Sequence, residues 1–67
     1  MKQHILNFLG NTGPQDLCQV IRACRTANPN NPPTRAAVYG ALLALRASGD
    51  VEQITDIDGI IYYQLNR

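Results

Sequence analysis

The chain has 67 residues, which is enough for one domain with a single modest core. Its net charge is +1, and this near-neutral total excludes both the strongly basic class of nucleic-acid binder and an acidic solvating tail. No apolar run approaches the roughly 20 residues of a membrane span, and no signal-peptide pattern follows Met1-Lys2. We therefore expect a small, soluble domain.

Two cysteines, Cys18 and Cys24, lie six residues apart in a segment with helical periodicity. On a helix they are about 9 Å apart along the axis and on different faces, whereas a disulfide needs Cα atoms within roughly 7 Å. His4 is the single histidine, and the sequence has no C-x-x-C motif that would complete a metal site. We expect no disulfide, no metal, no cofactor and a reducing cytoplasmic setting.

Three segments have helical spacing, at residues 2–10, 14–27 and 33–48. Their apolar residues recur three and four positions apart: Ile5, Phe8 and Leu9, then Leu17, Val20, Ile21 and Cys24, then Val38, Leu42 and Leu45. Pro14 is expected as the first residue of the second helix, with Thr12 or Gly13 as its cap and Asp16 in its first turn.

The third helix has signals at both of its ends. The loop NPNNPP at residues 28–33 precedes it, and Pro32 or Pro33 is expected to open it, with Asn31 or Thr34 as the cap. Gly49 is expected to supply a left-handed residue just after its last turn.

After Gly49 the apolar period changes from 3.6 to 2, which predicts strands at residues 51–55 and 60–65. Asp58-Gly59 between these two runs is a hairpin signal. In the second strand, alternation is expected to place Tyr63 in the core and Tyr62 on the opposite, exposed face.

Three helices followed by a two-stranded hairpin resemble a winged helix-turn-helix domain over essentially the whole chain. The resemblance is strongest in PTRAAVYGALLALRASGDVEQI, residues 33–54, where a long helix ends in Ser48-Gly49 and leads into the hairpin. The stretch GIIYYQLN, residues 59–66, adds the aromatic-x-Leu pair of Tyr63 and Leu65. The resemblance implies an α+β fold, a single winged helix domain over residues 1–67, and binding to double-stranded DNA. The protein would be a small transcriptional regulator or the DNA-binding part of a larger protein.

In this superfamily the third helix enters the DNA major groove. The resemblance thereby implies that Thr34, Arg35 and Tyr39 contact the groove or its edges. Arg22, Arg25 and Arg46 would position the phosphate backbone. A single module of this kind buries only roughly 600–1,000 Å² on DNA, so we expect a homodimer or a larger protein partner to be needed for useful affinity.

The charges are unevenly distributed along the chain. Residues 1–49 hold five basic residues against one acidic residue, a net charge of +4, and residues 50–67 hold four acidic residues against Arg67, a net charge of −3. A hairpin that lies along phosphates normally carries Lys or Arg. We therefore expect that the tip of this hairpin does not lie against phosphate.

Other interpretations remain open for several of these residues. Arg22 and Arg25 are also compatible with an ordinary solvated helix face. Cys18 beside them is either a redox-sensitive thiol or a half-buried structural cysteine. A protein-interaction or dimerisation module that does not touch DNA is the alternative function. Its contact surface would be the acidic cluster of the hairpin or the small, apolar face of the third helix, with Tyr39 and Leu43. Enzymatic activity and a small-molecule substrate are not expected, since no catalytic set or phosphate-binding loop occurs.

Overall fold

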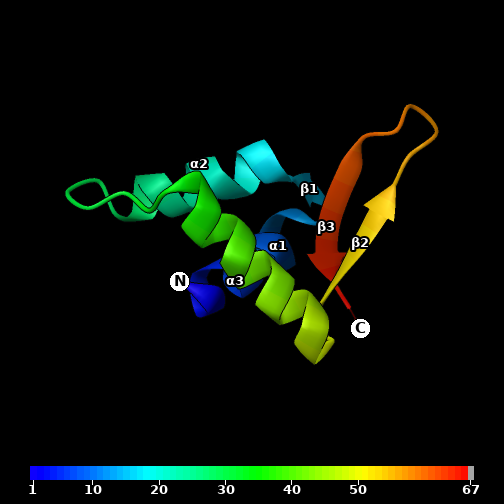
Figure 1. Ribbon diagram of the computed structural model, residues 1–67, viewed down its shortest axis with the longest axis horizontal. Helices are drawn as coiled ribbons and strands as arrows, with labels where there is room; N and C mark the ends of the chain where they lie inside the picture. Colours follow the sequence, from blue (N-terminus) through cyan, green and yellow to red (C-terminus); the bar gives the residue numbers. More distant parts are fainter. Residues whose placement is uncertain (67) are drawn as a thin grey trace.

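The computed structural model describes residues 1–66, in which three helices lie against a small antiparallel sheet (Figure 1). The elements follow the order α1 (Lys2–Thr12), β1 (Gln15–Asp16), α2 (Leu17–Ala27), α3 (Arg35–Ser48), β2 (Val51–Thr55) and β3 (Ile61–Leu65). The expected α+β class, with three helices followed by a β-hairpin, is confirmed. Arg67, which was counted in the charge of the hairpin, lies outside the described residues.

The sheet has three strands in the order β1-β3-β2, and both pairings are antiparallel. Strands β2 and β3 form the expected hairpin, with Val51 opposite Leu65 and Thr55 opposite Ile61. Strand β1 was not expected, and it pairs Gln15 with Tyr63 on the other edge of β3. This short strand ties the α1–α2 connection to the hairpin.

The second helix begins later than the sequence suggested. Pro14 is not its first residue, and neither Thr12 nor Gly13 caps it. Instead Asp16 is the N-cap, and its side chain accepts a hydrogen bond from the backbone N–H of Gln19 at 2.9 Å. The helix starts there because Asp satisfies an otherwise free N–H of the first turn, while the backbone just before it is engaged in β1.

The ends of α1 and α3 are both set by glycines with positive φ. Helix α1 runs past Gly10 to Thr12 and stops at Gly13, whose φ is 81°. Helix α3 is capped by Thr34 and opens at Arg35 rather than at a proline. At its other end Gly49 adopts the expected left-handed conformation, and the Asp50 N–H bonds the Leu45 carbonyl at 3.0 Å.

One core cluster joins the helices to the hairpin. Its buried members are Ile5, Leu9, Val20, Ile21, Cys24, Val38, Leu42, Leu45, Val51 and Tyr63. The predicted stripes of all three helices therefore face one another, and Tyr63 anchors β3 to them as expected. None of the described helices combines the length and the apolarity that crossing a membrane requires.

The hairpin projects beyond the core at its β2–β3 turn (Figure 1). The Asp56 side chain organises this turn by accepting hydrogen bonds from the N–H groups of Asp58 and Ile60, at 2.9 and 3.0 Å. Gly59 has a φ of 83°, a conformation that favours glycine. Of the expected Asp58-Gly59 signal, only Gly59 has the special backbone conformation, whereas the side-chain hydrogen bonds come from Asp56, and the turn carries a fully exposed Ile57.

Candidate nucleic-acid interface

Two of the residues predicted to contact DNA, Thr34 and Arg35, lie at the start of α3. The Thr34 hydroxyl oxygen accepts a hydrogen bond from the Ala37 N–H at 3.1 Å and so serves as the helix cap. Arg35 follows as the first residue of the helix and is exposed. Because the Thr34 oxygen is engaged with the backbone, its structural contribution is to fix the position from which Arg35 extends.

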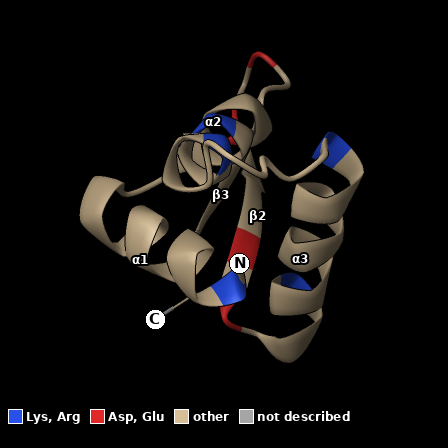
Figure 2. Cartoon of the chain, turned by 90° about the vertical axis from the view of Figure 1, so that its left-hand side faces the viewer, with Lys and Arg blue, Asp and Glu red and all other residues tan. Residues whose placement is uncertain are grey.

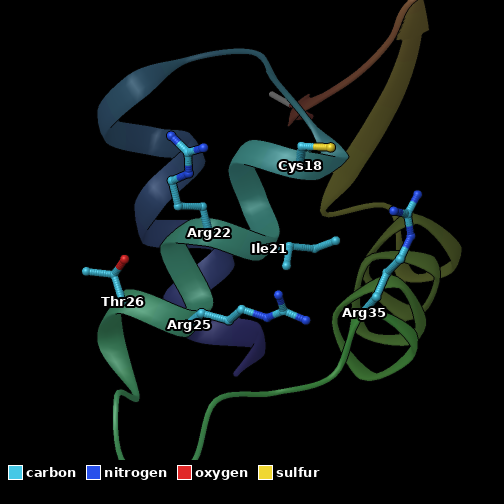
Figure 3. A pocket seen from close by; sticks show the side chains of 6 residues that line it. All are labelled: Cys18, Ile21, Arg22, Arg25, Thr26 and Arg35. Atoms are coloured by element: carbon cyan, nitrogen blue, oxygen red, sulfur yellow. The ribbon is translucent and has the colours of Figure 1, made fainter.

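Three arginines from two helices line one groove of about 460 Å³. Arg22 and Arg25 come from α2 and Arg35 from α3, and the rest of the lining is Cys18, Ile21 and Thr26. Figure 3 shows the Arg25 side chain reaching from α2 toward the start of α3, while Arg22 extends from the same helix in another direction. We call this the arginine groove. None of its described lining residues is acidic.

The Arg25 guanidinium is held in place by the backbone ahead of α3. Its Nε donates a hydrogen bond to the carbonyl oxygen of Pro33 at 3.2 Å. Pro33 precedes the cap residue Thr34, so this bond joins α2 to the entry of α3. The partner is neutral, which leaves the positive charge of Arg25 uncompensated by this contact.

Arg46 lies away from the arginine groove. It is 11 residues after Arg35 on the same helix, about 16 Å along the axis. Its Nη1 donates a hydrogen bond to Oε1 of Gln53 on β2 at 3.0 Å, so it lies beside the hairpin. The structure therefore gathers Arg22, Arg25 and Arg35 and leaves Arg46 apart from them.

Tyr39 faces a second, largely apolar groove of about 600 Å³ between α3 and the sheet. Its lining residues are Leu17, Arg35, Ala36, Tyr39, Ile61 and Tyr63. Tyr39 is 42% exposed and lies one helical turn after Arg35. Arg35 lines both this groove and the arginine groove. We call this the α3–β3 groove.

Two buried groups titrate above their ordinary range. Burial raises the pKa of the Tyr63 hydroxyl above 10.0; the nearby Tyr39 raises it further, and Arg46 partly offsets this. Burial also raises the pKa of the Cys24 thiol above 9.0, against a smaller lowering effect of the N-terminal charge. Both groups are therefore protonated, core-forming groups at neutral pH.

The charge asymmetry expected from the sequence is visible in the fold. Figure 2 shows Lys and Arg on α2 and at the start of α3, and Asp and Glu along the β2–β3 hairpin and at its tip. The four acidic residues of the hairpin region, Asp50, Glu52, Asp56 and Asp58, are all exposed. The basic groove and the acidic hairpin are thus separate surfaces of the chain.

Several features of this surface differ from the expectation or were missed. Cys18 is exposed at the rim of the arginine groove rather than half-buried, and both cysteines are free. Tyr62 is half-buried rather than exposed, because β1 pairs beside it at Asp16. The fully exposed Ile57 was not singled out, although its position between two aspartates in an expected turn could have indicated it. Within residues 1–66 no group of three or more metal-binding side chains occurs.

No family model, curated protein or solved structure matches the chain. Function is therefore inferred from the side chains that the fold brings together.

Proposed function

We propose that the chain is a winged helix domain of the helix-turn-helix type that binds double-stranded DNA, as a small transcriptional regulator or as the DNA-binding part of a larger protein. The observation that carries this proposal is the arginine groove. Arg22 and Arg25 on α2 and Arg35 at the first position of α3 line one hollow with no acidic neighbour among the described lining residues. Guanidinium groups without an acidic neighbour suit phosphate oxygens and guanine edges.

In this proposal α3 approaches the major groove with its N-terminal half. Arg35 is placed to reach a base edge or a phosphate, and Tyr39, one turn later, to reach the edge of the groove. Exposed small residues, Ala36 and Gly40, each follow one of these two side chains in the helix, and a Cβ added at Gly40 would meet nothing within 4 Å. The helix backbone therefore has room for close approach. Thr34 acts by fixing the start of the helix.

The remaining arginines take the phosphate contacts. Arg22 and Arg25 lie on α2, the helix that crosses the DNA backbone in this type of domain. Arg46 lies beside the hairpin, where it donates a hydrogen bond to Gln53. We assign it to a phosphate farther along the DNA than those that Arg22 and Arg25 contact. The acidic hairpin tip is directed away from phosphate, since Asp56 and Asp58 would be repelled there.

The proposed setting is the cytoplasm, because two free thiols suit a reducing compartment. A single domain of this size contacts a short stretch of DNA, so tight binding calls for a homodimer or a larger protein partner.

The test is a salt titration of binding to duplex DNA of random sequence. Each phosphate neutralised contributes about −0.9 to the slope of log K against log salt. The Arg22→Ala/Arg25→Ala/Arg35→Ala variant is expected to reduce the slope by about 2.7 and to bind at least about tenfold more weakly at low salt. Lys2→Ala is the matched control, because Lys2 is a cation on α1 outside the groove lining. Absence of binding at low salt, or equal loss in the control, would overturn the proposal.

A protein-interaction module is the second candidate, and the α3–β3 groove favours it. Tyr39 and Ile61 are exposed on this groove at 42% and 43%, and Leu43 is exposed one turn beyond Tyr39. Apolar side chains that converge in this way are typical of protein contacts. Ile61→Ala discriminates the two functions, because Ile61 is assigned no DNA contact: a DNA binder keeps its affinity and its salt slope in this variant. Absence of DNA binding by the wild type, together with weaker binding of a protein partner by this variant, would indicate the second function.

A further inference from the structure

The tip of the β2–β3 hairpin presents an apolar side chain between two carboxylates. Ile57 is fully exposed, and Asp56 and Asp58 flank it in the exposed turn. The turn is ordered before it meets anything, because the Asp56 carboxylate accepts the N–H groups of Asp58 and Ile60. An exposed isoleucine on an ordered turn loses little conformational freedom on binding.

The arginine groove has the complementary chemistry. Its lining includes Ile21, a core residue that is 7% exposed, together with Arg22, Arg25 and Arg35. An isoleucine that rests against Ile21 leaves its flanking carboxylates within the field of these cations. The groove and the hairpin tip are therefore complementary in charge, and Ile21 adds a small apolar surface to the groove.

We propose that the hairpin tip of one copy of this chain docks in the arginine groove of a second copy. In this contact Ile57 of one copy lies against Ile21 of the other, and Asp58 faces Arg35. The contact does not depend on DNA binding. It uses arginines of the proposed DNA site, so this self-association competes with DNA and is not the homodimer that tight DNA binding calls for.

The charge distribution selects a second copy as the occupant. Residues 1–49 carry a net charge of +4, whereas residues 50–67 hold four acidic residues and one basic residue, a net charge of −3. Contacts between two hairpins or between two arginine grooves are repulsive, and only the hairpin-to-groove arrangement is attractive. Since the two surfaces are different parts of one chain, a pair of copies can make the contact twice about a two-fold axis.

The size of these surfaces indicates a weak, salt-sensitive association. Stable complexes bury about 800 Å² per partner, close to a fifth of the 4355 Å² surface of this chain. A five-residue turn seated in one groove covers less than that. The self-association is therefore expected only at high protein concentration and low ionic strength.

A charge-swap experiment by analytical ultracentrifugation without DNA tests this contact. Asp58→Arg and Arg35→Asp each place like charges together in a pair of identical copies, and each is expected to raise the dissociation constant at least about tenfold. An equimolar mixture of the two variants restores opposite charges at both contacts and is expected to regain wild-type association to within about threefold. Both changes suit the fold: the Asp58 side chain accepts no turn hydrogen bond, and Asp is favoured in the first turn of a helix.

Ile57→Thr supplies an independent measurement, with Ile54→Thr as its control. Both positions lie on the hairpin and are exposed, but only Ile57 is at the tip. We expect Ile57→Thr to associate more weakly than the wild type and Ile54→Thr to associate as strongly as the wild type. A wild-type protein that stays monomeric at about 1 mM, or a variant mixture that associates no better than its components, would overturn the proposal. Either result leaves the proposed DNA binding to be judged by its own salt titration.

Discussion

The Nε atom of Arg25 on α2 donates a hydrogen bond to the carbonyl oxygen of Pro33, 3.2 Å away in the segment that leads into α3. Arg25 thereby has two roles, as a cation of the arginine groove and as a tie between the two helices. The tie lies at the surface, so its contribution to stability is modest. The two roles are separable because lysine keeps the charge and lacks the Nε donor.

We expect Arg25→Lys to leave the salt slope of DNA binding within about 0.5 of the wild type, since the phosphate-neutralising charge remains. The same variant is expected to lose about 0.5 kcal/mol of unfolding free energy, because the bond to Pro33 is gone. Urea denaturation and the salt titration measure the two effects. Arg22→Lys, at an α2 position with no such tie, is the control and should leave stability unchanged. Equal stabilities for both variants would show that the Pro33 contact contributes nothing.

Thr34 is expected to act on DNA binding through the helix start rather than by direct contact. Thr34→Ala removes the acceptor of the Ala37 N–H and should cost about 1 kcal/mol of stability. Thr34→Ser keeps this acceptor and is expected to retain both stability and DNA affinity. If Thr34→Ser weakens DNA binding while stability holds, the threonine methyl group contacts the DNA.

The hairpin tip allows a direct test of where the β2–β3 hairpin lies relative to DNA. Replacing both Asp56 and Asp58 with lysine would also disturb the turn, because the Asp56 carboxylate holds it through two backbone N–H groups. Asp58→Lys alone adds positive charge without removing either bond. We expect it to strengthen non-specific DNA binding at low salt by removing a repulsive charge. An unchanged affinity and salt slope would contradict this placement of the acidic hairpin.

Asp56→Ala is expected to destabilise the domain by about 1 kcal/mol, because it leaves two turn N–H groups without their acceptor. Asp58→Ala should be neutral to within about 0.5 kcal/mol. Thermal unfolding of the two variants compares these positions directly. Asp56→Asn keeps an acceptor oxygen and is expected to recover most of the loss.

The sequence was most informative where a signal is local. Capping chemistry predicted Thr34, as one of two candidates, for the start of α3 and Gly49 for its end. The 3.6-residue period predicted the apolar stripe of α3. Strand β1 did not follow, because two residues carry no alternation and their pairing depends on the placement of β3. Pro14 suggested a helix start that the Asp16 cap and this pairing override.

The candidate site was predictable only in part for the same reason. Helical spacing places Arg22 and Arg25 side by side on α2. That Arg35 lines the same groove depends on how α2 and α3 pack and on the path of residues 28–34, which no local pattern encodes. Arg35 and Arg46 share a flank of α3, yet three helical turns separate them, and the bond to Gln53 directs Arg46 to the hairpin.

Thiol labelling probes the arginine groove from within. Cys18 lines the groove and is exposed, whereas Cys24 is buried in the core. We expect Cys18 to react with a disulfide reagent at least about 10³-fold faster than Cys24, which becomes accessible only when the domain opens. Duplex DNA at low salt should slow the reaction of the Cys18 thiol with the reagent, because DNA would cover the groove. Cys18→Ser removes the fast phase and identifies it, and a rate that DNA does not change would place the DNA elsewhere.

Tyr63 gives the fold a pH dependence in the alkaline range. Burial raises its folded-state pKa above the ordinary value of 10.0, so the folded state retains a proton that the unfolded chain has lost. The stabilising effect of neutral Tyr63 is complete below about pH 10 and is lost as the pH rises through the folded-state pKa. Tyr63→Phe keeps the ring and removes the titration. The unfolding free energies of the two proteins should run parallel below about pH 9 and diverge above about pH 10, where the wild type declines more steeply.

Ionisation of Cys24 also lowers the unfolding free energy at alkaline pH. Because the wild type and Tyr63→Phe both contain Cys24, its effect cancels when the two are compared. Arg46→Gln adds a second check, because Arg46 lowers the pKa of Tyr63. Its removal should move the tyrosinate absorbance transition of Tyr63 to higher pH. Parallel curves for the wild type and Tyr63→Phe up to the alkaline unfolding limit would mean that the hydroxyl ionises as easily in the folded state as in the unfolded chain.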